Sequence, residues 1–398
     1  MPRKLRLMLA IGVMPALAIF AALFSLSTIA TGLVPERATQ LPVLNANAHA
    51  AEAAAGLGGF GTPKGAEAAA AMTRAGRETF LSEPINANAI SLMALARQLG
   101  GDLPGARALY EHAIVVDKRN RLANLWLIED ASANGRLGYI LDRYDVLLRT
   151  GGPTSTALYD TLATALREPA MVPHLEARLV RNPPWAEQFW LRVAPNPGAI
   201  ANLGELRLRL LARKIGNPAN NDGDIVRRLV GLSEYDIAAR LARSIAGAPA
   251  GGGFTIRNGE FAARPLVPPF DWETYTGTEF GAELDPASGV LSFFSVTSID
   301  NLVAHQLSEA KAGRYVINYR VRNPEVLGQL QSTLRLRCAE PAMALGTLPL
   351  TRATGGAAFT VPPTCRYLWV ELWAKREAAP SGYPEDALLE SVEVRAAP

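Results

Sequence analysis

The spacing of apolar side chains changes once along this chain, and the change constrains the fold more than any other feature. From about Asn86 to Ile245 apolar positions recur every three to four residues, which is the spacing of amphipathic helices. After residues 246–253, which are small, Gly-rich and uncharged, the period becomes two, as in β-strands. Such a stretch is typical of a boundary between packed units. The pattern predicts an α-helical domain over 84–246, a linker over 247–257 and a β domain over 258–398.

Residues 1–37 combine a basic start with a long uncharged run. Leu7 to Leu33 carries no formal charge, and as a helix it would reach about 40 Å, enough to cross a bilayer. Arg3, Lys4 and Arg6 precede it, and basic flanks stay on the cytoplasmic side. The segment predicts a single-pass transmembrane helix in the inner (cytoplasmic) membrane, with the bulk of the chain in the periplasm. The alternative is a cleaved signal peptide, whose apolar core is shorter, about 7–15 residues.

Residues 38–83 are rich in Ala, Gly and Asn and hold few large side chains. Such a segment buries too little apolar area to offset its ordering entropy, so it predicts a flexible tether. Gly56 to Gly61 spells the dinucleotide fingerprint G-x-G-x-x-G. In a nucleotide-binding unit this motif follows a β-strand, but no β-branched run precedes it here. We therefore predict no cofactor.

One part of the helical domain carries a repeat signal. Its residues are Ala94, Gly101, Ala106, Tyr110 and Ala113. This spacing resembles the tetratricopeptide repeat, which has small residues where paired helices approach and an aromatic where the next repeat packs. Gly135 and Tyr144 follow Gly101 and Tyr110 at the 34-residue period. The sequence departs from the family at Ile128 and Ile140, where the family keeps small residues, and at Lys118, where it has Pro.

The resemblance implies a degenerate solenoid, whose exposed surface suits a peptide or a partner protein. Trp126, Trp185 and Trp190 fall in this helical part, and we interpret them as core packing between stacked helices rather than as ligand contacts.

The sequence of residues 258–398 predicts an antiparallel β-sandwich, because short segments of alternating apolar and polar residues follow one another without an intervening helix. The predicted strands are Val290–Val296, Leu302–Leu307, Arg314–Arg322, Thr333–Cys338, Ala357–Val361, Tyr367–Ala374 and Leu388–Arg395. The opening segments Asn258–Phe261 and Pro268–Trp272 and the closing segment Leu388–Val394 resemble the first and last strands of jelly-roll carbohydrate-binding modules with a galactose-binding-like fold. The resemblance implies a jelly roll and, more weakly, a sugar ligand.

Alternation along the strands supplies candidate ligand-binding residues. One face of Tyr367–Ala374 carries flat rings, and other strands present Arg and Asn at one parity. The candidates are Tyr367, Trp369, Trp373, Asn318, Arg320, Arg335 and Arg337. If they share one sheet, rings beside charged donors form a platform for a polysaccharide. The alternative is that both faces of the strand are buried and the tryptophans belong to the core.

Cys338 and Cys365 lie on or beside neighbouring predicted strands, so in the periplasm they are expected to form a disulfide. They lack the C-x-x-C spacing of a metal site, and no histidine completes four ligands, so no metal is predicted. An acidic run follows the start of the sandwich, at Asp271, Glu273, Glu279, Glu283 and Asp285. The jelly-roll resemblance allows a structural calcium there, and a solvated loop explains the same run.

Charge and motifs exclude several functions. Forty Lys and Arg against thirty-seven Asp and Glu leave a formal charge of +3, which gives no basic field for nucleic acid. His49, His112, His174 and His305 are scattered, and no nucleophile or zinc motif accompanies them, so we predict no catalytic residues and no enzyme. A glycoside hydrolase would need two facing carboxylates, and spacing leaves this open for Asp271, Glu273 and Glu371.

The two resemblances together imply a non-catalytic accessory protein of envelope or exopolysaccharide assembly, because such domain pairings look like those of accessory proteins of that kind. Its helices would bind a partner protein and its sandwich a polysaccharide. A structural scaffold without glycan binding is the alternative.

Overall fold

The computed structural model describes residues 65–151, 155–246, 254–376 and 385–397, together with a few isolated positions between 19 and 40. The predicted transmembrane helix and most of the predicted tether lie outside these ranges. Among the described residues, no helix has both the length and the apolar character needed to span a membrane. The chain divides into two compact units after Leu158.

The first unit is built from consecutive helices. They are α5 (Gly65–Ser82), α6 (Ala87–Leu99), α7 (Leu103–Val116), α8 (Arg121–Ala133) and α9 (Leu137–Thr150). Each packs on the next along the chain. Their core combines small buried residues, such as Ala94, Ala106 and Ala113, with the ring of Tyr110 stacked on Trp126 at 4.7 Å between centroids. The small side chains let the paired helices approach closely around one aromatic stack.

The turns of this unit follow from local sequence. Asp102 caps α7 by accepting a hydrogen bond from the amide of Gly105 at 2.9 Å, with Pro104 in the first turn. Gly101 and Gly135 both have positive φ, 83° and 65°, a backbone conformation that glycine adopts without strain. The two glycines that carry the predicted repeat therefore occupy the same kind of turn.

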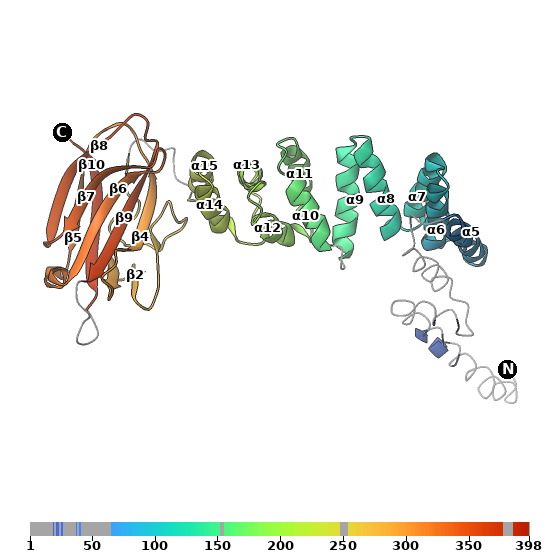
Figure 1. Ribbon diagram of the computed structural model, residues 1–398, viewed down its shortest axis with the longest axis horizontal. Coiled ribbons are helices and arrows are strands. Elements are labelled where there is room, and N and C mark those ends of the chain that lie inside the picture. The colour runs from blue at the N-terminus through green and yellow to red at the C-terminus, as the bar shows by residue number, and fades with distance from the viewer. Residues whose placement is uncertain are drawn as a thin grey trace, which may run out of the picture. The chain divides into compact units, whose positions relative to one another are not determined.

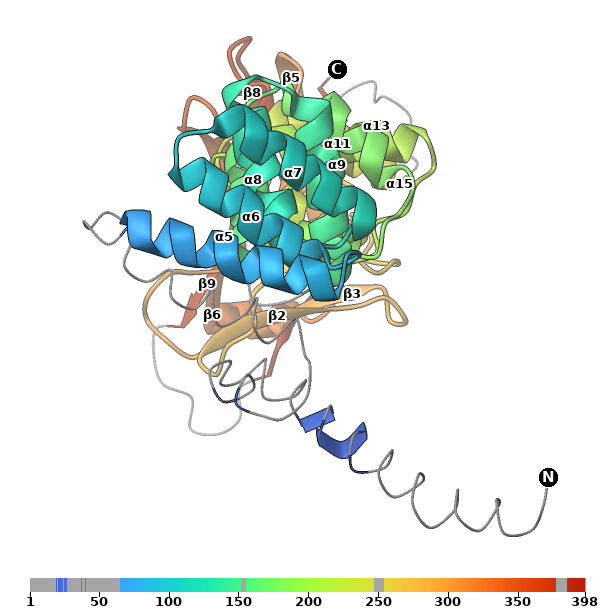
Figure 2. The same cartoon turned by 90° about the vertical axis from the view of Figure 1, so that its right-hand side faces the viewer.

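Residues 65–82 form helix α5, not a flexible tether. Met72 and Thr79 are 2% and 3% exposed, and α5 lies beside α6, as Figure 2 shows in blue. The alanine-rich sequence alone predicts too little buried surface, and packing against α6 supplies the missing burial.

The second unit begins with further helices. They are α10 (Ser155–Ala165), which crosses the division, then α11 (Met171–Leu179), α12 (Ala186–Val193), α13 (Ile200–Ala212), α14 (Asp222–Gly231) and α15 (Tyr235–Ala246). Trp185 and Trp190 are 4% and 1% exposed and meet Phe189 edge to face. In the first unit Trp126 is 9% exposed. The interpretation of the three tryptophans as core residues is confirmed.

A two-sheet antiparallel β-sandwich follows, drawn in orange and red in Figure 1. Its strands are β1 (Glu273–Thr274), β2 (Phe280–Asp285), β3 (Val290–Ser295), β4 (Asn301–Glu309), β5 (Gly313–Val321), β6 (Leu330–Cys338), β7 (Met343–Leu350), β8 (Thr354–Val361), β9 (Tyr367–Arg376) and β10 (Ala387–Ala396), with the 3₁₀ helix η3 (Pro324–Gly328) before β6. One sheet has the order β1-β4-β9-β6-β7, and the other has the order β2-β3-β10-β5-β8.

The strand prediction misses β1, β2 and β7. β1 has two residues, β2 is rich in carboxylates, and β7 contains Gly346 and Pro349, residue types that weaken a strand signal and suit sheet edges. The linker prediction also ends too late. Phe254 is 3% exposed and packs edge to face on Tyr315 and Phe359, so the described residues 254–257 belong to the sandwich.

Candidate functional site

The outer face of the sheet β1-β4-β9-β6-β7 holds most of the candidate residues. On β9, Leu368, Val370 and Leu372 are buried in the sandwich core, so the alternate side chains Trp369 and Trp373 point away from it. β9 is flanked by β4 and β6. Its outer side chains therefore have neighbours on both sides.

Strand register brings two arginines of β6 onto the same face. Arg335 lies opposite Glu371, and Arg337 lies opposite Trp369. Glu371 accepts a hydrogen bond at 2.7 Å from Nη2 of Arg337 and another at 3.0 Å from Nε1 of Trp373. Glu371 is 6% exposed, so the carboxylate that accepts both bonds is buried. The carboxylate thereby fixes the positions of a guanidinium and an indole.

Arg335 completes this arrangement. Its guanidinium lies over the Trp373 ring at 4.5 Å from the centroid and forms an ion pair with Asp300 at 2.6 Å. We call Asp300, Arg335, Arg337, Glu371 and Trp373 the Glu371 network. Trp373 remains half-buried, and the side chains of Arg335 and Arg337 are 34% and 39% exposed. These three side chains of the network are therefore accessible to a ligand.

Trp369 and Tyr367 are closed off. Trp369 is 9% exposed and lies against the His305 ring at 4.7 Å between centroids. Tyr367 is 7% exposed, and its ring contacts that of Tyr235 at 5.3 Å. These two rings lie under neighbouring side chains because β9 is an interior strand. They contribute to packing more than to an open platform.

Asn318 and Arg320 lie on the opposite sheet. Both belong to β5, which pairs with β8 and β10. Arg320 is exposed and lies 3.8 Å from the carboxylate of Glu390. The structure therefore places five of the seven candidates on one sheet and these two on the other. Of the predicted charged and polar donors, only Arg335 and Arg337 share a sheet with the aromatic residues of β9.

Sequence reasoning missed a cluster around His305. Nε2 of His305 lies 3.0 Å from Oε2 of Glu273, and Oε1 of Glu273 accepts a hydrogen bond at 2.6 Å from Nε of Arg227 on α14. Burial raises the pKa of Glu273, but the hydrogen bonds from His305 and Arg227 outweigh it and hold the pKa below its ordinary value of 4.5. Alternation along β4 was the sequence signal that could have shown which face His305 occupies. The pairing of β4 with β9 puts His305 on the same face as Trp369.

The Glu273 carboxylate predicts an acid-sensitive contribution to stability. Because its pKa is lowered in the folded state, its contribution is present above the unfolded value and is lost as pH falls through the folded value. We expect Glu273→Gln to flatten the decline in the urea midpoint below about pH 4.5. Glu279→Gln is the control, because Glu279 is exposed. An unchanged decline in Glu273→Gln would contradict the assignment.

The carboxylates considered for glycoside hydrolysis are all engaged. Asp271 is 4% exposed and accepts a hydrogen bond at 3.0 Å from the amide of Leu266. Glu273 contacts His305 and Arg227. Glu371 accepts hydrogen bonds from Arg337 and Trp373. Each of the three carboxylates therefore accepts at least one hydrogen bond from a neighbouring group. Across the described part of the chain, no group of three or more His, Cys, Asp or Glu side chains is placed to hold a metal ion.

Cys338 and Cys365 form a disulfide, with their Cα atoms 5.6 Å apart. The two residues are 0% and 2% exposed and belong to the sandwich core. The predicted pairing is confirmed, and it joins the end of β6 to the segment that leads into β9.

Fold and site define a helical protein with a C-terminal antiparallel two-sheet β-sandwich that carries an aromatic and charged surface. No protein-family model matches the sequence, and no curated protein shows significant similarity to it.

Proposed function

We propose that this protein is a non-catalytic binding protein of the cell envelope, anchored in the inner membrane by residues 1–37 and exposed to the periplasm. Its sandwich, a galactose-binding-like jelly roll in this proposal, binds a polysaccharide. Its helices, tetratricopeptide-like, bind a partner protein. Together these activities suit an accessory role in envelope or exopolysaccharide assembly.

The Glu371 network carries the glycan part of the proposal. Trp373 offers a half-buried indole whose position is fixed by the hydrogen bond to Glu371. Arg335 and Arg337 offer partly exposed donors beside it. A fixed ring next to charged donors suits a sugar, because the ring packs on the C–H face of a pyranose while the donors reach its hydroxyl groups. Preorganisation by Glu371 lowers the entropy cost of binding.

Exposed apolar side chains support a partner for the helices. Leu81, Ile85 and Val115 of the first unit are 73%, 83% and 75% exposed. Large apolar side chains left in water favour association when a partner covers them.

The engaged carboxylates support the absence of catalysis. A general acid must hold a proton that it can donate, whereas the hydrogen bonds from His305 and Arg227 hold the pKa of Glu273 below its ordinary value. The disulfide supports the periplasmic location, because such bonds persist in oxidising compartments.

Polysaccharide binding by the purified full-length protein tests the proposal. We expect Trp373→Ala to weaken binding to an array of envelope polysaccharides and exopolysaccharides at least tenfold, or about 1.4 kcal/mol. Tyr139→Ala is the matched control, since Tyr139 is a half-buried ring flanked by Arg136 and Arg143 in the first unit. Its binding should be unchanged.

Three outcomes would contradict the proposal. Equal binding by Trp373→Ala and the unchanged protein would remove the Glu371 network from the site. Absence of binding to every polysaccharide on the array would favour a structural scaffold. Release of sugar products would favour a glycan hydrolase.

A further inference from the structure

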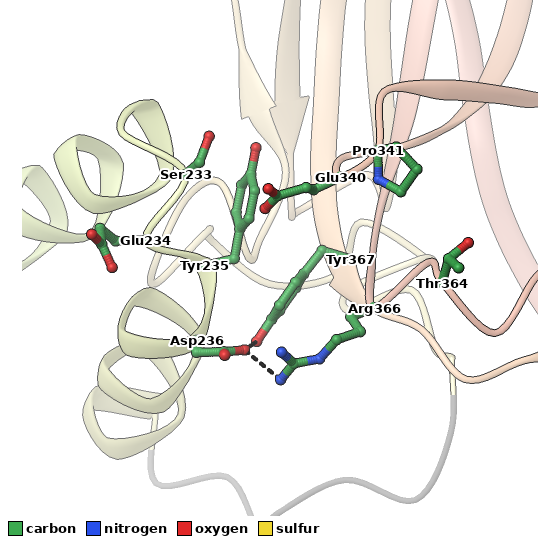
Figure 3. Close-up of a pocket in the computed structure, with 9 residues that line it drawn as sticks. All are labelled: Ser233, Glu234, Tyr235, Asp236, Glu340, Pro341, Thr364, Arg366 and Tyr367. Atoms are coloured by element: carbon green, nitrogen blue, oxygen red, sulfur yellow. Dashed lines mark hydrogen bonds and ion pairs between the residues drawn. The ribbon is translucent and has the colours of Figure 1, made fainter.

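A cavity of about 320 Å³ lies within the second unit, where the turn from α14 to α15 meets loops at one end of the sandwich (Figure 3). It is separate from the Glu371 network. Its lining residues are Ser233, Glu234, Tyr235, Asp236, Glu340, Pro341, Thr364, Arg366 and Tyr367. The volume is at the small end of the range for small-molecule sites, about 300–1,000 Å³, and suits one sugar unit.

Two hydrogen bonds to Asp236 fix the side chains along one wall of the cavity. The Asp236 carboxylate accepts hydrogen bonds at 2.7 Å from Nη2 of Arg366 and at 2.7 Å from the hydroxyl of Tyr367. Burial and the hydrogen bond to Asp236 raise the pKa of Tyr367, so its hydroxyl stays protonated and remains a donor. The Tyr235 ring rests on Tyr367 at 5.3 Å between centroids. These contacts fix the Tyr235 ring and neutralise Asp236.

Glu340 supplies an unpaired charge on the opposite side. Among the described residues its carboxylate has no hydrogen-bond or ion-pair partner, and its side chain points toward the Tyr235 ring. The carboxylate of Glu234 also lacks a partner in the described part of the chain, but it points away from the cavity (Figure 3). The charge that faces a ligand here is therefore negative and belongs to Glu340.

The neighbouring groups restrict what can balance this charge. The described residues provide no cluster that could hold a metal ion, which disfavours a bare divalent cation. An anionic sugar would be repelled by Glu340. The hydroxyls of Ser233 and Thr364 and the ring of Tyr235 line the same space, and they suit hydroxyl groups and a C–H face rather than a bare ammonium ion. A protonated amine on a sugar ring matches all of these groups.

We propose that this cavity binds one amino-sugar unit of a glycan, with the amine at Glu340 and the sugar ring against Tyr235. The inference rests on the proposed function in taking the ligand to be a glycan, and it names the sugar class at a second site. A partly deacetylated polysaccharide would then bind at two places on the second unit.

Calorimetry with the full-length protein tests this proposal. The probes are a glucosamine tetramer and its fully N-acetylated counterpart, at physiological ionic strength. We expect the glucosamine tetramer to bind at least tenfold more tightly, because acetylation removes the positive charge. Glu340→Gln and Tyr235→Ala should each weaken its binding at least tenfold. Glu234→Gln is the matched control, an acidic residue of the same cavity that points elsewhere, and it should change binding less than twofold.

Several results would overturn the inference. These are equal binding of the two tetramers, equal losses in Glu340→Gln and Glu234→Gln, or equally tight binding of spermidine or a lysine-rich peptide. Trp373→Ala separates this inference from the proposed function. If that variant loses polysaccharide binding and Glu340→Gln does not affect the glucosamine tetramer, only the inference fails. If Glu340→Gln weakens binding of the glucosamine tetramer while Trp373→Ala leaves polysaccharide binding unchanged, only the proposed role of the Glu371 network is contradicted. Circular dichroism of each variant identifies any that is unfolded, and the comparison of the two tetramers on the unchanged protein stands without them.

Discussion

Replacing Arg207 with methionine is expected to remove about 3–5 kcal/mol from the free energy of unfolding of the second unit. Arg207 is 2% exposed and holds both oxygens of Asp222, with Nε to Oδ1 at 2.8 Å and Nη2 to Oδ2 at 2.9 Å. Its Nη1 donates to the carbonyl of Ile215 at 2.7 Å. Without the guanidinium, the Asp222 carboxylate keeps the hydrogen bond from Nδ2 of Asn217 at 2.6 Å but loses its cationic partner, and the carbonyl of Ile215 loses the donor from Arg207. Chemical denaturation followed by circular dichroism at 222 nm measures the loss.

We attribute the large expected loss to the burial of the Arg207 ion pair, not to ion pairing itself. A second, exposed arginine tests this explanation. Arg240 binds both oxygens of Glu205 at 2.6 and 3.0 Å, but its side chain is 49% exposed. Arg240→Met should cost at most about 1 kcal/mol, because water replaces the lost partner. The double variant Arg207→Met/Asp222→Asn should recover part of the loss by removing the unpaired charge. Equal losses in the two single variants would show that Arg207 is no more than a surface ion pair.

Local features of the fold could be predicted because a few neighbouring residues determine them. Asp102, Pro104 and Gly101 form a helix start and the turn before it from adjacent positions. Alternation on β9 separates Leu368 and Val370 from Trp369 without knowledge of the partner strand, since successive side chains point to opposite faces.

Strand order could not be predicted, and it decides which candidates meet. Arg337 and Asn318 have the same kind of alternation in sequence. β6 pairs with β9, whereas β5 pairs with β10 and β8. Nothing in the strands' own sequences marks these partners, because pairing between distant segments depends on how the whole sheet closes. The same reason hid the cavity, since Glu340 and Tyr235 are far apart in the sequence and meet only in the folded unit.

Helix α5 shows the limit of composition as a guide. Its alanine-rich sequence has good intrinsic helix propensity but few side chains large enough to form a core. Met72 is nonetheless 2% exposed, and Phe80 packs against the core of the neighbouring helices. Whether such a segment is ordered depends on the surface that it meets, which its own residues do not reveal.

Removing the disulfide is expected to cost the sandwich about 3.5 kcal/mol, because the 27-residue separation of Cys338 and Cys365 fixes the chain entropy that the bond removes from the unfolded state. The variant is Cys338→Ala/Cys365→Ala. Urea denaturation followed by tryptophan fluorescence measures the change, since Trp272, Trp369 and Trp373 lie in the sandwich. The control is the unchanged protein denatured in reductant. Its midpoint should approach that of the variant, because both chains then lack the cross-link.

The same cysteines connect stability to location. A sandwich that depends on its disulfide suits an oxidising compartment, where the bond persists after folding. We therefore expect mass spectrometry of protein isolated from the native envelope, denatured in the presence of excess alkylating reagent, to find Cys338 and Cys365 joined. Two free thiols would contradict the proposed periplasmic location. A midpoint that the double variant leaves unchanged would instead show that the sheets are held by their packed core alone, with the bond adding nothing to it.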